Sequence, residues 1–328
     1  MNRKSARIVA AGAGRMGRSM GVAFAYAGYS VSLLDLKARD QQAAQTLELQ
    51  AREEIAEHLA TLVRLEVVPA SGATQIAERI SIHRLEQAGS VLADADLVFE
   101  GVPEVLQSKR EAFELIERLA GPACIVASTT SSFLSSELAA MFSLPGRFLN
   151  AHWLNPAYLI PLVEVSPHDQ TAAEVTTRVC DLLADIGKET VVCKASPGYI
   201  VPRLQALIMN EAVRMVEEGV ASPADIDKAT RLGFGMRYAS MGVLEFVDFG
   251  GLDILYYASR YMATSVDSDR YKTPALVESM MAEGRTGVRA GQGLYDWRDQ
   301  DADQFRDQAL GRFVALLREQ NLMKPPVL

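Results

Sequence analysis

The sequence of 328 residues is poor in several features that define particular protein classes. It has only three cysteines and no CxxC spacing, so we expect neither a disulfide framework nor a cysteine zinc site. The odd cysteine count is typical of a reducing cytosol and predicts a cytoplasmic protein. No apolar run approaches ~18 residues, which argues against a membrane span. The N-terminal apolar run enters a glycine turn without a cleavage site, so no signal peptide is expected.

The sequence also has few positive charges: 33 Lys and Arg against 41 Asp and Glu give a net charge of −8. Proteins that bind nucleic-acid phosphates or anionic bilayers normally carry the opposite sign. We therefore expect no nucleic-acid partner and no membrane partner, and small molecules as ligands. The apolar fraction of 49% and the charged fraction of 23% are those of an ordinary globular chain. The length allows two domains.

Short apolar runs alternate with helical patterns over the first two-thirds of the chain. This alternation predicts an α/β fold with a doubly wound parallel sheet covered by helices. Seven runs are predicted as strands: residues 7–11, 30–35, 96–100, 124–128, 148–151, 162–165 and 189–193. The polar stretch 37–83, rich in Ala, Glu and Gln, is predicted to form an exposed helical hairpin.

The character of the sequence changes after Lys194. Residues 195–198 read Ala-Ser-Pro-Gly, a turn and predicted domain boundary, and nothing beyond them has a strand pattern. The sequence therefore predicts one domain over residues 1–194 and an all-helical domain over 195–328. Within the latter, Ser222 and Pro223 form a helix start and Gly233 fits its end.

The first predicted strand runs into Gly-Ala-Gly-Arg-Met-Gly at residues 12–17, followed by a helical pattern. The spacing GxGxxG is weak evidence alone, but a strand before it and a helix after it strengthen it. Its glycines permit a tight turn, close approach of a pyrophosphate, and close packing of helix on strand. The helix N-terminus offers N–H groups to that anion. We expect these residues to bind a dinucleotide: Gly12, Gly14, Arg15, Met16 and Gly17.

Asp35 ends the next predicted strand, near the spacing of ~20 residues expected after such a turn. A carboxylate there accepts hydrogen bonds from both ribose hydroxyls and repels a 2′-phosphate, so we expect NAD rather than NADP. Arg39 is expected to lie too far along the chain to displace the effect of the acid. The alternative is a plain strand–turn–helix unit without a ligand.

His152 follows an apolar strand, and ligands of open α/β sheets gather at such carboxyl ends. A single histidine there is more often structural than catalytic. Glu164, however, interrupts the apolar run 162–165, and a carboxylate in a buried strand is costly unless paired. We expect Glu164 to hold one imidazole nitrogen of His152, which would leave the other as a general base.

The ordered set of motifs resembles the 3-hydroxyacyl-CoA dehydrogenase family from about residue 7 to 297. The set comprises GAGRMG with Asp35, STTSS at 128–132, HWLNP at 152–156, PLVEV at 161–165, PGYIV at 197–201 and GQGLYD at 291–296. The resemblance implies a Rossmann-like domain followed by a helical domain that forms a homodimer. It also implies hydride transfer between NAD and carbon 3 of a hydroxylated substrate.

The resemblance implies roles for several residues. The catalytic pair falls on His152 and Glu164, and the side chains that contact the substrate oxygen fall on Ser131 and Asn155. The residues that face the nicotinamide end of the cofactor fall on Glu104 and Lys109. Simpler interpretations stay open: Ser131 as a helix cap, Asn155 as a turn residue and Lys109 as a solvated helix lysine.

The sequence departs from the family at positions that bear on the substrate. Pro202 stands where the family has an asparagine, and Pro161 where acyl-CoA members have a lysine. The stretch 233–238 resembles the branch that acts on free hydroxy acids, such as gulonate and carnitine dehydrogenases. Arg237 in it is a candidate clamp for a substrate carboxylate, or else a surface arginine. The acid-rich stretch 37–83 does not suit the phosphates of CoA. We therefore favour a 3-hydroxy acid over a 3-hydroxyacyl thioester.

Three alternatives remain. The first is a 3-hydroxybutyryl-CoA dehydrogenase proper. The second is a dehydrogenase of the 3-hydroxyisobutyrate and 6-phosphogluconate class, which uses a lysine base after a glycine-rich motif; no such motif occurs between residues 110 and 200. The third is a non-enzymatic NAD-binding protein like the lens crystallin of the same branch, against which the His152–Glu164 pair argues.

Overall fold

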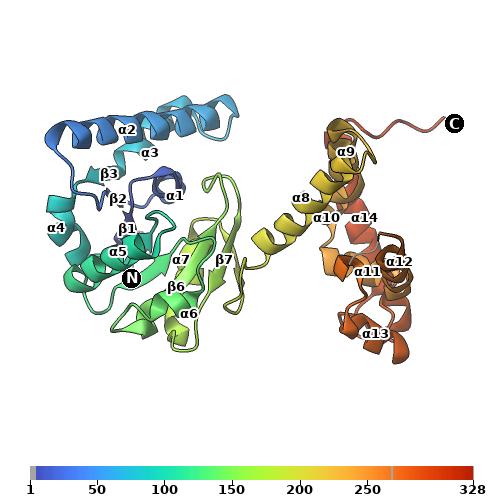
Figure 1. Ribbon diagram of the computed structural model, residues 1–328. Helices are drawn as coiled ribbons and strands as arrows, with labels where there is room; N and C mark the ends of the chain where they lie inside the picture. Colours follow the sequence, from blue (N-terminus) through green and yellow to red (C-terminus); the bar gives the residue numbers. More distant parts are fainter. Residues whose placement is uncertain (1–4, 267–268, 328) are drawn as a thin grey trace. The chain divides into compact units, whose positions relative to one another are not determined.

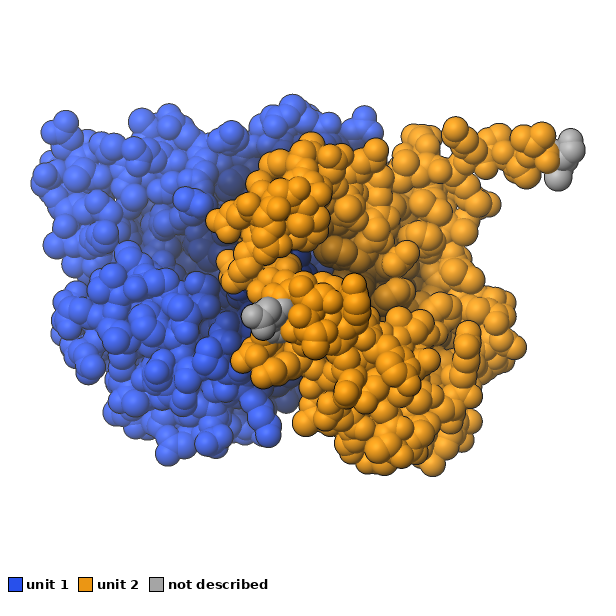
Figure 2. Space-filling model, turned by 45° about the vertical axis from the view of Figure 1, so that its right-hand side comes forward, with its two compact units in different colours: residues 1–208 blue, residues 209–328 orange. Residues whose placement is uncertain are grey.

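The computed structural model describes residues 5–266 and 269–327. The chain divides into two compact units, residues 1–208 and 209–328, coloured separately in Figure 2. Residues 1–4 of the first predicted domain, and 267–268 and 328 of the second, lie outside the described residues. The two units divide within helix α8 (Val201–Glu217), whereas the predicted boundary at 194/195 falls in the turn before it. The boundary at 194/195 stays a prediction.

The first unit contains an eight-stranded sheet in the order β3-β2-β1-β4-β5-β6-β7-β8. Strands β1, β2, β3, β6 and β7 of this sheet are labelled in Figure 1. Neighbouring strands run parallel except β6 and β7, which pair antiparallel. The strands are β1 (Ile8–Ala11), β2 (Val31–Leu34), β3 (Ile80–His83), β4 (Leu97–Glu100), β5 (Ile125–Ser128), β6 (Phe148–Trp153), β7 (Leu162–Ser166) and β8 (Glu189–Val192).

Helices cover both faces of this sheet, as predicted for a doubly wound fold. Those of the first unit are α1 (Arg15–Tyr26), α2 (Gln41–Arg64), α3 (Ala70–Glu78), α4 (Ala88–Ala93), α5 (Leu106–Leu119), α6 (Ser135–Ala139) and α7 (Ala173–Asp185), followed by the start of α8. Alternate strand residues pack against α1, α2, α3 and α7 on one face, and against α4, α5 and α6 on the other. Because both faces are buried, the inner strands read as continuous apolar runs.

The predicted helical hairpin over 37–83 is only partly correct. Helices α2 and α3 pack against each other (Figure 1), but residues 80–83 form strand β3, which pairs parallel with β2. Ile80 is buried against Val31 and belongs to the core of that face, whereas Ser81 is exposed. Tertiary pairing with β2 therefore decides the structure of this four-residue segment, which follows a long helical pattern.

The second unit is helical over its described residues. After α8 come α9 (Pro223–Ala229), α10 (Met236–Ser240), α11 (Val243–Gly250), α12 (Leu252–Ser265), α13 (Ala275–Ala282) and α14 (Ala302–Glu319). Ser222 caps α9 by accepting a hydrogen bond from the Asp225 N–H, as its sequence predicts. The predicted end at Gly233 is wrong, because a π-helical turn (Thr230–Gly235) continues the chain into α10. None of the described helices is long and apolar enough to cross a membrane.

One buried carboxylate organises the C-terminal part of this unit. Asp248, only 1% exposed, accepts hydrogen bonds of 2.9 Å from the N–H groups of Leu294 and Tyr295 and from the indole of Trp297. A Cβ atom at Gly293 would lie 2.3 Å from an oxygen of Asp248, so only glycine fits there. The glycine-rich motif at 291–296 is thus held against α11 by a buried acid.

Candidate active site

The turn between β1 and α1 has the geometry of an anion-binding loop. Gly12 has φ +127, and a Cβ atom there would lie 2.7 Å from the carbonyl oxygen of Gly101. A Cβ atom at Gly17 would lie 2.2 Å from the carbonyl oxygen of Gly12. Gly14, by contrast, has open space beside it and precedes the first residue of α1. Two glycines therefore allow the turn to close, and the third leaves the helix N-terminus accessible to a phosphate.

Asp35 lies directly after β2, where the sequence places it, and its side chain is buried. Its Oδ1 also accepts a long hydrogen bond from the Lys37 N–H, at 3.3 Å. The distance expected for Arg39 was wrong, because its Nε lies 2.5 Å from Oδ2 of Asp35, whereas its effect on the choice of cofactor stays a prediction. Arg39 lies four residues after Asp35, and this spacing lets its guanidinium reach the Asp35 carboxylate. Part of the negative charge at this end of the site is therefore neutralised.

A second arginine, Arg18, which the sequence reasoning missed, holds the backbone of the glycine turn. Arg18 is buried in α1, and its Nε donates a hydrogen bond of 2.9 Å to the carbonyl of Ala13. Its other end forms an ion pair of 2.5 Å with Glu54 on α2. The long helix α2 thereby fixes the residue between two of the glycines. A charged residue in the otherwise small and apolar face of α1 was the signal for it.

His152 and Glu164 are direct partners across the antiparallel pair β6 and β7. Nδ1 of His152 lies 2.8 Å from Oε2 of Glu164, and the two side chains are 5% and 0% exposed. The structure thus brings together the two residues that the sequence pairs. Because a carboxylate oxygen accepts hydrogen bonds, we assign Nδ1 as the donor of this contact, and Nε2 takes no part in it.

The other oxygen of Glu164 also has partners. Oε1 accepts hydrogen bonds of 2.9 and 2.8 Å from the N–H groups of Ile200 and Val201, at the start of α8. Three donors therefore surround one buried carboxylate, and one of its oxygens lies at the N-terminus of α8. This arrangement offsets the cost of burying the charge. The sequence reasoning did not foresee the role of this helix start.

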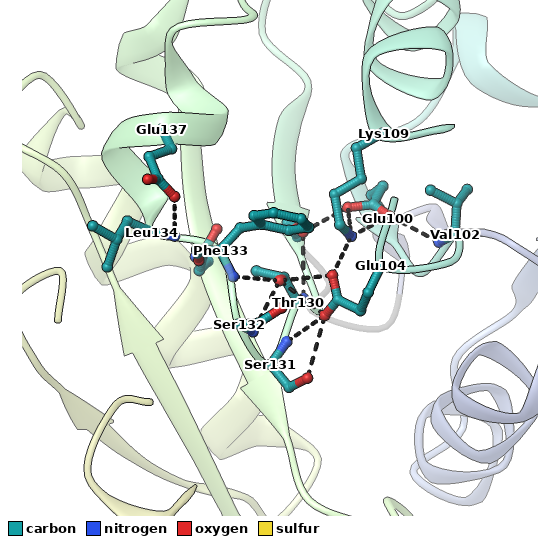
Figure 3. A network of polar contacts seen from close by, with 12 residues as sticks. Glu100, Val102, Glu104, Lys109, Thr130, Ser131, Ser132, Phe133, Leu134 and Glu137 are labelled. Carbon is teal, nitrogen blue, oxygen red and sulfur yellow. Dashed lines mark hydrogen bonds and ion pairs between the residues drawn. The ribbon is translucent and has the colours of Figure 1, made fainter. Parts of the chain in front are cut away.

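A buried network lies beside the strand ends (Figure 3). Lys109 on α5, 1% exposed, places its ammonium 3.1 Å from both oxygens of Glu100 and 3.4 Å from Glu104. Ser128 donates a hydrogen bond of 2.5 Å to Glu100. Burial raises the pKa of Glu100 against the opposing effects of Lys109 and Ser128. The interpretation of Lys109 as a solvated helix lysine is therefore wrong.

Glu104 connects this network to Ser131 (Figure 3). One of its oxygens accepts hydrogen bonds from the Ser131 N–H at 2.6 Å and from the Ser131 hydroxyl at 3.3 Å, and the Thr130 hydroxyl contacts both oxygens. Partial burial alone would raise the pKa of Glu104. The Ser131 N–H and the charge of Lys109 outweigh that effect and lower the pKa below its ordinary value.

One cavity of about 660 Å³ joins these features. It is lined by the glycine turn, Asp35, Glu104, Ser131, His152 and Asn155. Its volume lies in the range of natural ligand sites. The residues present fit a dinucleotide, because an open helix N-terminus can take the pyrophosphate and Asp35 can take a ribose. The cavity then continues to the imidazole of His152.

Most of the predicted site residues thus surround one cavity. Arg15 and Met16 line it at the start of α1, and Asn155 lines it in the loop after β6. Lys109 is not among the lining residues but contacts Glu104, which is. Arg237 lies on α10 of the second unit, exposed, with its guanidinium 5.5 Å from the centre of the Phe246 ring. Its role toward a substrate stays a prediction.

Comparisons with known proteins cover nearly the whole chain. Residues 7–196 match "3-hydroxyacyl-CoA dehydrogenase, NAD binding domain", and residues 198–297 match "3-hydroxyacyl-CoA dehydrogenase, C-terminal domain". A probable 3-hydroxybutyryl-CoA dehydrogenase of Bacillus subtilis is 31% identical, over 89% of this chain and 98% of the relative. A 5-formyl-3-hydroxy-2-methylpyridine 4-carboxylate 5-dehydrogenase of Mesorhizobium japonicum is 28% identical, over 95% and 97%.

Solved structures give the same result. The crystal structure of a 3-hydroxyacyl-CoA dehydrogenase from Archaeoglobus fulgidus is 30% identical and has a TM-score of 0.74. The match covers 97% of this chain and 100% of that one. Both the NAD-binding domain and the C-terminal domain of one family are therefore present in their usual order. The chain is an NAD-dependent oxidoreductase and belongs to the 3-hydroxyacyl-CoA dehydrogenase family.

Proposed function

We propose that the protein oxidises and reduces carbon 3 of a 3-hydroxy compound, with His152 as the general base and Glu164 as its support. The observation that carries this proposal is the 2.8 Å contact between His152 and Glu164 at the wall of the cavity. A bound NAD supplies the hydride acceptor. The protein then has to orient the substrate and take up one proton.

His152 performs the proton transfer in this mechanism. Nε2 removes the hydroxyl proton as the C3–H bond breaks, and the substrate becomes a ketone. The imidazolium that forms keeps its Nδ1–H directed at Glu164, whose charge stabilises it. A positioned base of this kind contributes on the order of 10²–10⁴ to the rate. In the reverse direction the same imidazolium returns the proton to the oxygen.

Ser131 and Asn155 are proposed to contact the substrate oxygen. Both line the cavity together with His152. Glu104 accepts hydrogen bonds from the backbone and the hydroxyl of Ser131, which fixes the position of that side chain. Asp35 and the glycine turn are proposed to hold the adenosine half of the cofactor, and Glu104 with Lys109 to face its nicotinamide half.

The substrate is proposed to be a free 3-hydroxy acid rather than a CoA thioester. Glu53 and Glu57 are exposed on α2, and their charge opposes the phosphates of CoA. Pro202 lies in the first turn of α8, where it offers no side-chain donor. The Mesorhizobium relative acts, by its name, on a pyridine carboxylate. A 3-hydroxyacyl-CoA such as 3-hydroxybutyryl-CoA is the alternative.

The second unit is proposed to form a homodimer. Ile254, Tyr257 and Tyr261 follow one face of α12 and are 64%, 64% and 69% exposed. A soluble monomer rarely keeps such large apolar side chains together in water. A second copy of the chain is the partner that the family resemblance implies.

The test is a matched substrate panel. NADH formation is followed at 340 nm with 3-hydroxybutyryl-CoA and with the free acids gulonate, carnitine and 3-hydroxybutyrate. We expect kcat/KM to be highest with a free acid. A higher value with the thioester would overturn the substrate assignment. No turnover with any of the four compounds would overturn the reaction at carbon 3.

The His152→Gln variant tests the base. We expect a fall in kcat of about 10³-fold, because positioned proton transfer is lost. NADH affinity should stay near that of the wild type, since Asp35 and the glycine turn are unchanged. His168→Gln is the matched control, because His168 contacts the carbonyl of Pro145 at 3.0 Å, away from the cavity lining. Full activity of the His152 variant would overturn the mechanism.

A further inference from the structure

Tyr199 packs directly on the proposed base. Its ring lies almost parallel to the imidazole of His152, with 4.9 Å between the ring centres and 9° between the planes. Tyr199 is 5% exposed, so water does not separate the two rings. An imidazole that carries charge during proton transfer is favoured over the face of an aromatic ring. The stack also restricts rotation of the imidazole about its side-chain bonds.

The hydroxyl of Tyr199 is tied to the loop that carries Ser131. It donates a hydrogen bond of 2.9 Å to the carbonyl of Thr130 and accepts one of 3.0 Å from the amide of Asn150. Burial raises the pKa of Tyr199 well above its ordinary value, so the phenol remains protonated and able to donate. One side chain therefore connects β6, the Thr130–Ser131 backbone and the imidazole.

The backbone at this position is unusual. Tyr199 has φ +46, in the left-handed region that large side chains rarely adopt, and follows Gly198 at φ +75. Such a conformation costs free energy and persists only where the surroundings enforce it. The same turn directs the N–H groups of Ile200 and Val201 at Glu164. The strained turn thus serves both members of the His–Glu pair.

We propose that Tyr199 is a positioning residue that holds the imidazole of His152 and the Ser131 loop in the arrangement needed for proton removal. The proposal rests on the proposed function, because it assigns Tyr199 to the same reaction. A misplacement of about 1 Å costs on the order of 10²-fold in rate when groups must meet in one geometry. The ring of Tyr199 holds the imidazole of His152. Its hydroxyl holds the carbonyl of Thr130 and thereby positions the next residue, Ser131, which we propose to contact the substrate oxygen.

Two variants separate these effects. Tyr199→Phe keeps the ring and removes the hydroxyl, so Ser131 loses part of its support; we expect KM for the hydroxy substrate to rise about tenfold with little change in kcat. Tyr199→Leu removes the ring as well, and we expect kcat to fall by about 10²-fold. NADH affinity should stay unchanged in both, since Tyr199 does not line the cofactor cavity.

Tyr29→Phe is the matched control. Tyr29 is also buried, and its hydroxyl donates to Asp185 at 2.7 Å, away from the cavity lining. This variant should keep the kcat and KM of the wild type. Thermal unfolding and NADH titration of all three variants report whether they fold. If Tyr199→Phe and Tyr199→Leu lose activity only in proportion to lost folded protein, the role is structural and the proposal is overturned.

A second readout does not need turnover. The ring current of Tyr199 should shift the imidazole proton resonances of His152 in NMR spectra. We expect this shift to remain in Tyr199→Phe and to disappear in Tyr199→Leu. An active wild type with unaffected Tyr199 variants would overturn the positioning role alone. A wild type inactive with every hydroxy compound would instead overturn the proposed function.

Discussion

The two units of the chain use buried groups in different ways. Unit 1, residues 1–208, has two large apolar clusters, one on each face of its sheet. Its buried polar side chains include His152 and Glu164, for which we propose a role in the site. In the described part of unit 2, one cluster has only three buried members, Leu252, Val277 and Met280. There the buried Asp248 holds a loop in place.

This difference shows that burial of a charged residue does not by itself indicate function. Glu164 and Asp248 are each almost fully buried, and each accepts three hydrogen bonds. One partner of Glu164 is an imidazole at a cavity wall. The three hydrogen-bond partners of Asp248 lie in the segment 294–297 of its own unit. What a buried acid contacts, rather than its burial, distinguishes the two roles.

The largest effect is expected from Asp248→Ala. The change leaves two N–H groups and the indole of Trp297 without their acceptor, so unit 2 should lose about 3 kcal/mol of stability. Calorimetry should show a lower unfolding transition, while NADH still binds at temperatures below it. Gly293→Ala should act similarly, because its Cβ would clash with Asp248. An unchanged transition in both variants would show that the buried acid does not stabilise unit 2.

Tyr257→Glu tests whether the apolar face of α12 is covered by a second copy. Burying a charge in such an interface should weaken association by about 100-fold. In analytical ultracentrifugation at equal protein concentrations, the Tyr257→Glu variant should have half the mass of the wild type. Leu49→Glu is the control, because Leu49 is 59% exposed on α2 of unit 1. If Leu49→Glu weakens self-association as much as Tyr257→Glu does, the apolar face of α12 is not the specific dimer interface.

Asp35→Asn tests whether a buried polar group of unit 1 binds the cofactor. NAD should bind about tenfold more weakly, because one charged hydrogen-bond acceptor is lost. NADP should gain relative to NAD, since the change releases Arg39 from its ion pair with the acid. Titration of both cofactors measures the ratio. In the double variant with Arg39→Ala, NADP affinity should no longer rise relative to NAD affinity. If it still rises, Arg39 has no part in the choice between the two cofactors.

The smallest effect is expected from Glu104→Gln and depends on pH. The folded-state pKa of Glu104 lies below the ordinary 4.5, so its ionised form stabilises the fold above about pH 4.5. That contribution is lost as pH falls through the folded-state pKa. The variant should melt about 2 °C lower at pH 7, and the difference should shrink at pH 3. A difference that grows on acidification contradicts the assignment.

Much of the fold of unit 1 could be predicted because its parallel strands are buried on both faces. Such strands read as apolar runs separated by helical patterns, and all seven predicted strands are present. Strand β3 could not be recognised, since only Ile80 and Ile82 mark it and a long polar helix precedes it. In unit 2, Gly233 indicates a helix end by its type, but the π-helical turn Thr230–Gly235 carries the chain through it into α10.

The predicted site depended on residues that break a local pattern. Glu164 interrupts an apolar strand, and the structure gives it His152 as a partner. Glu100 also ends an apolar strand, so the same signal was available for the Glu100–Lys109 pair. Tyr199 gave no such signal, because its contact with His152 arises only when the turn before α8 packs on β6. Long-range packing of this kind is not encoded in any local pattern.

The register of β6 and β7 has a consequence for how the protein tolerates change. His152 and Glu164 face each other because successive side chains of a strand point to opposite sides. One residue inserted inside β7 would turn Glu164 to the wrong face of the sheet. The same residue inserted near the exposed Leu159, in the connecting loop, would leave the pairing intact. The phase of the two strands therefore decides whether His152 and Glu164 face each other.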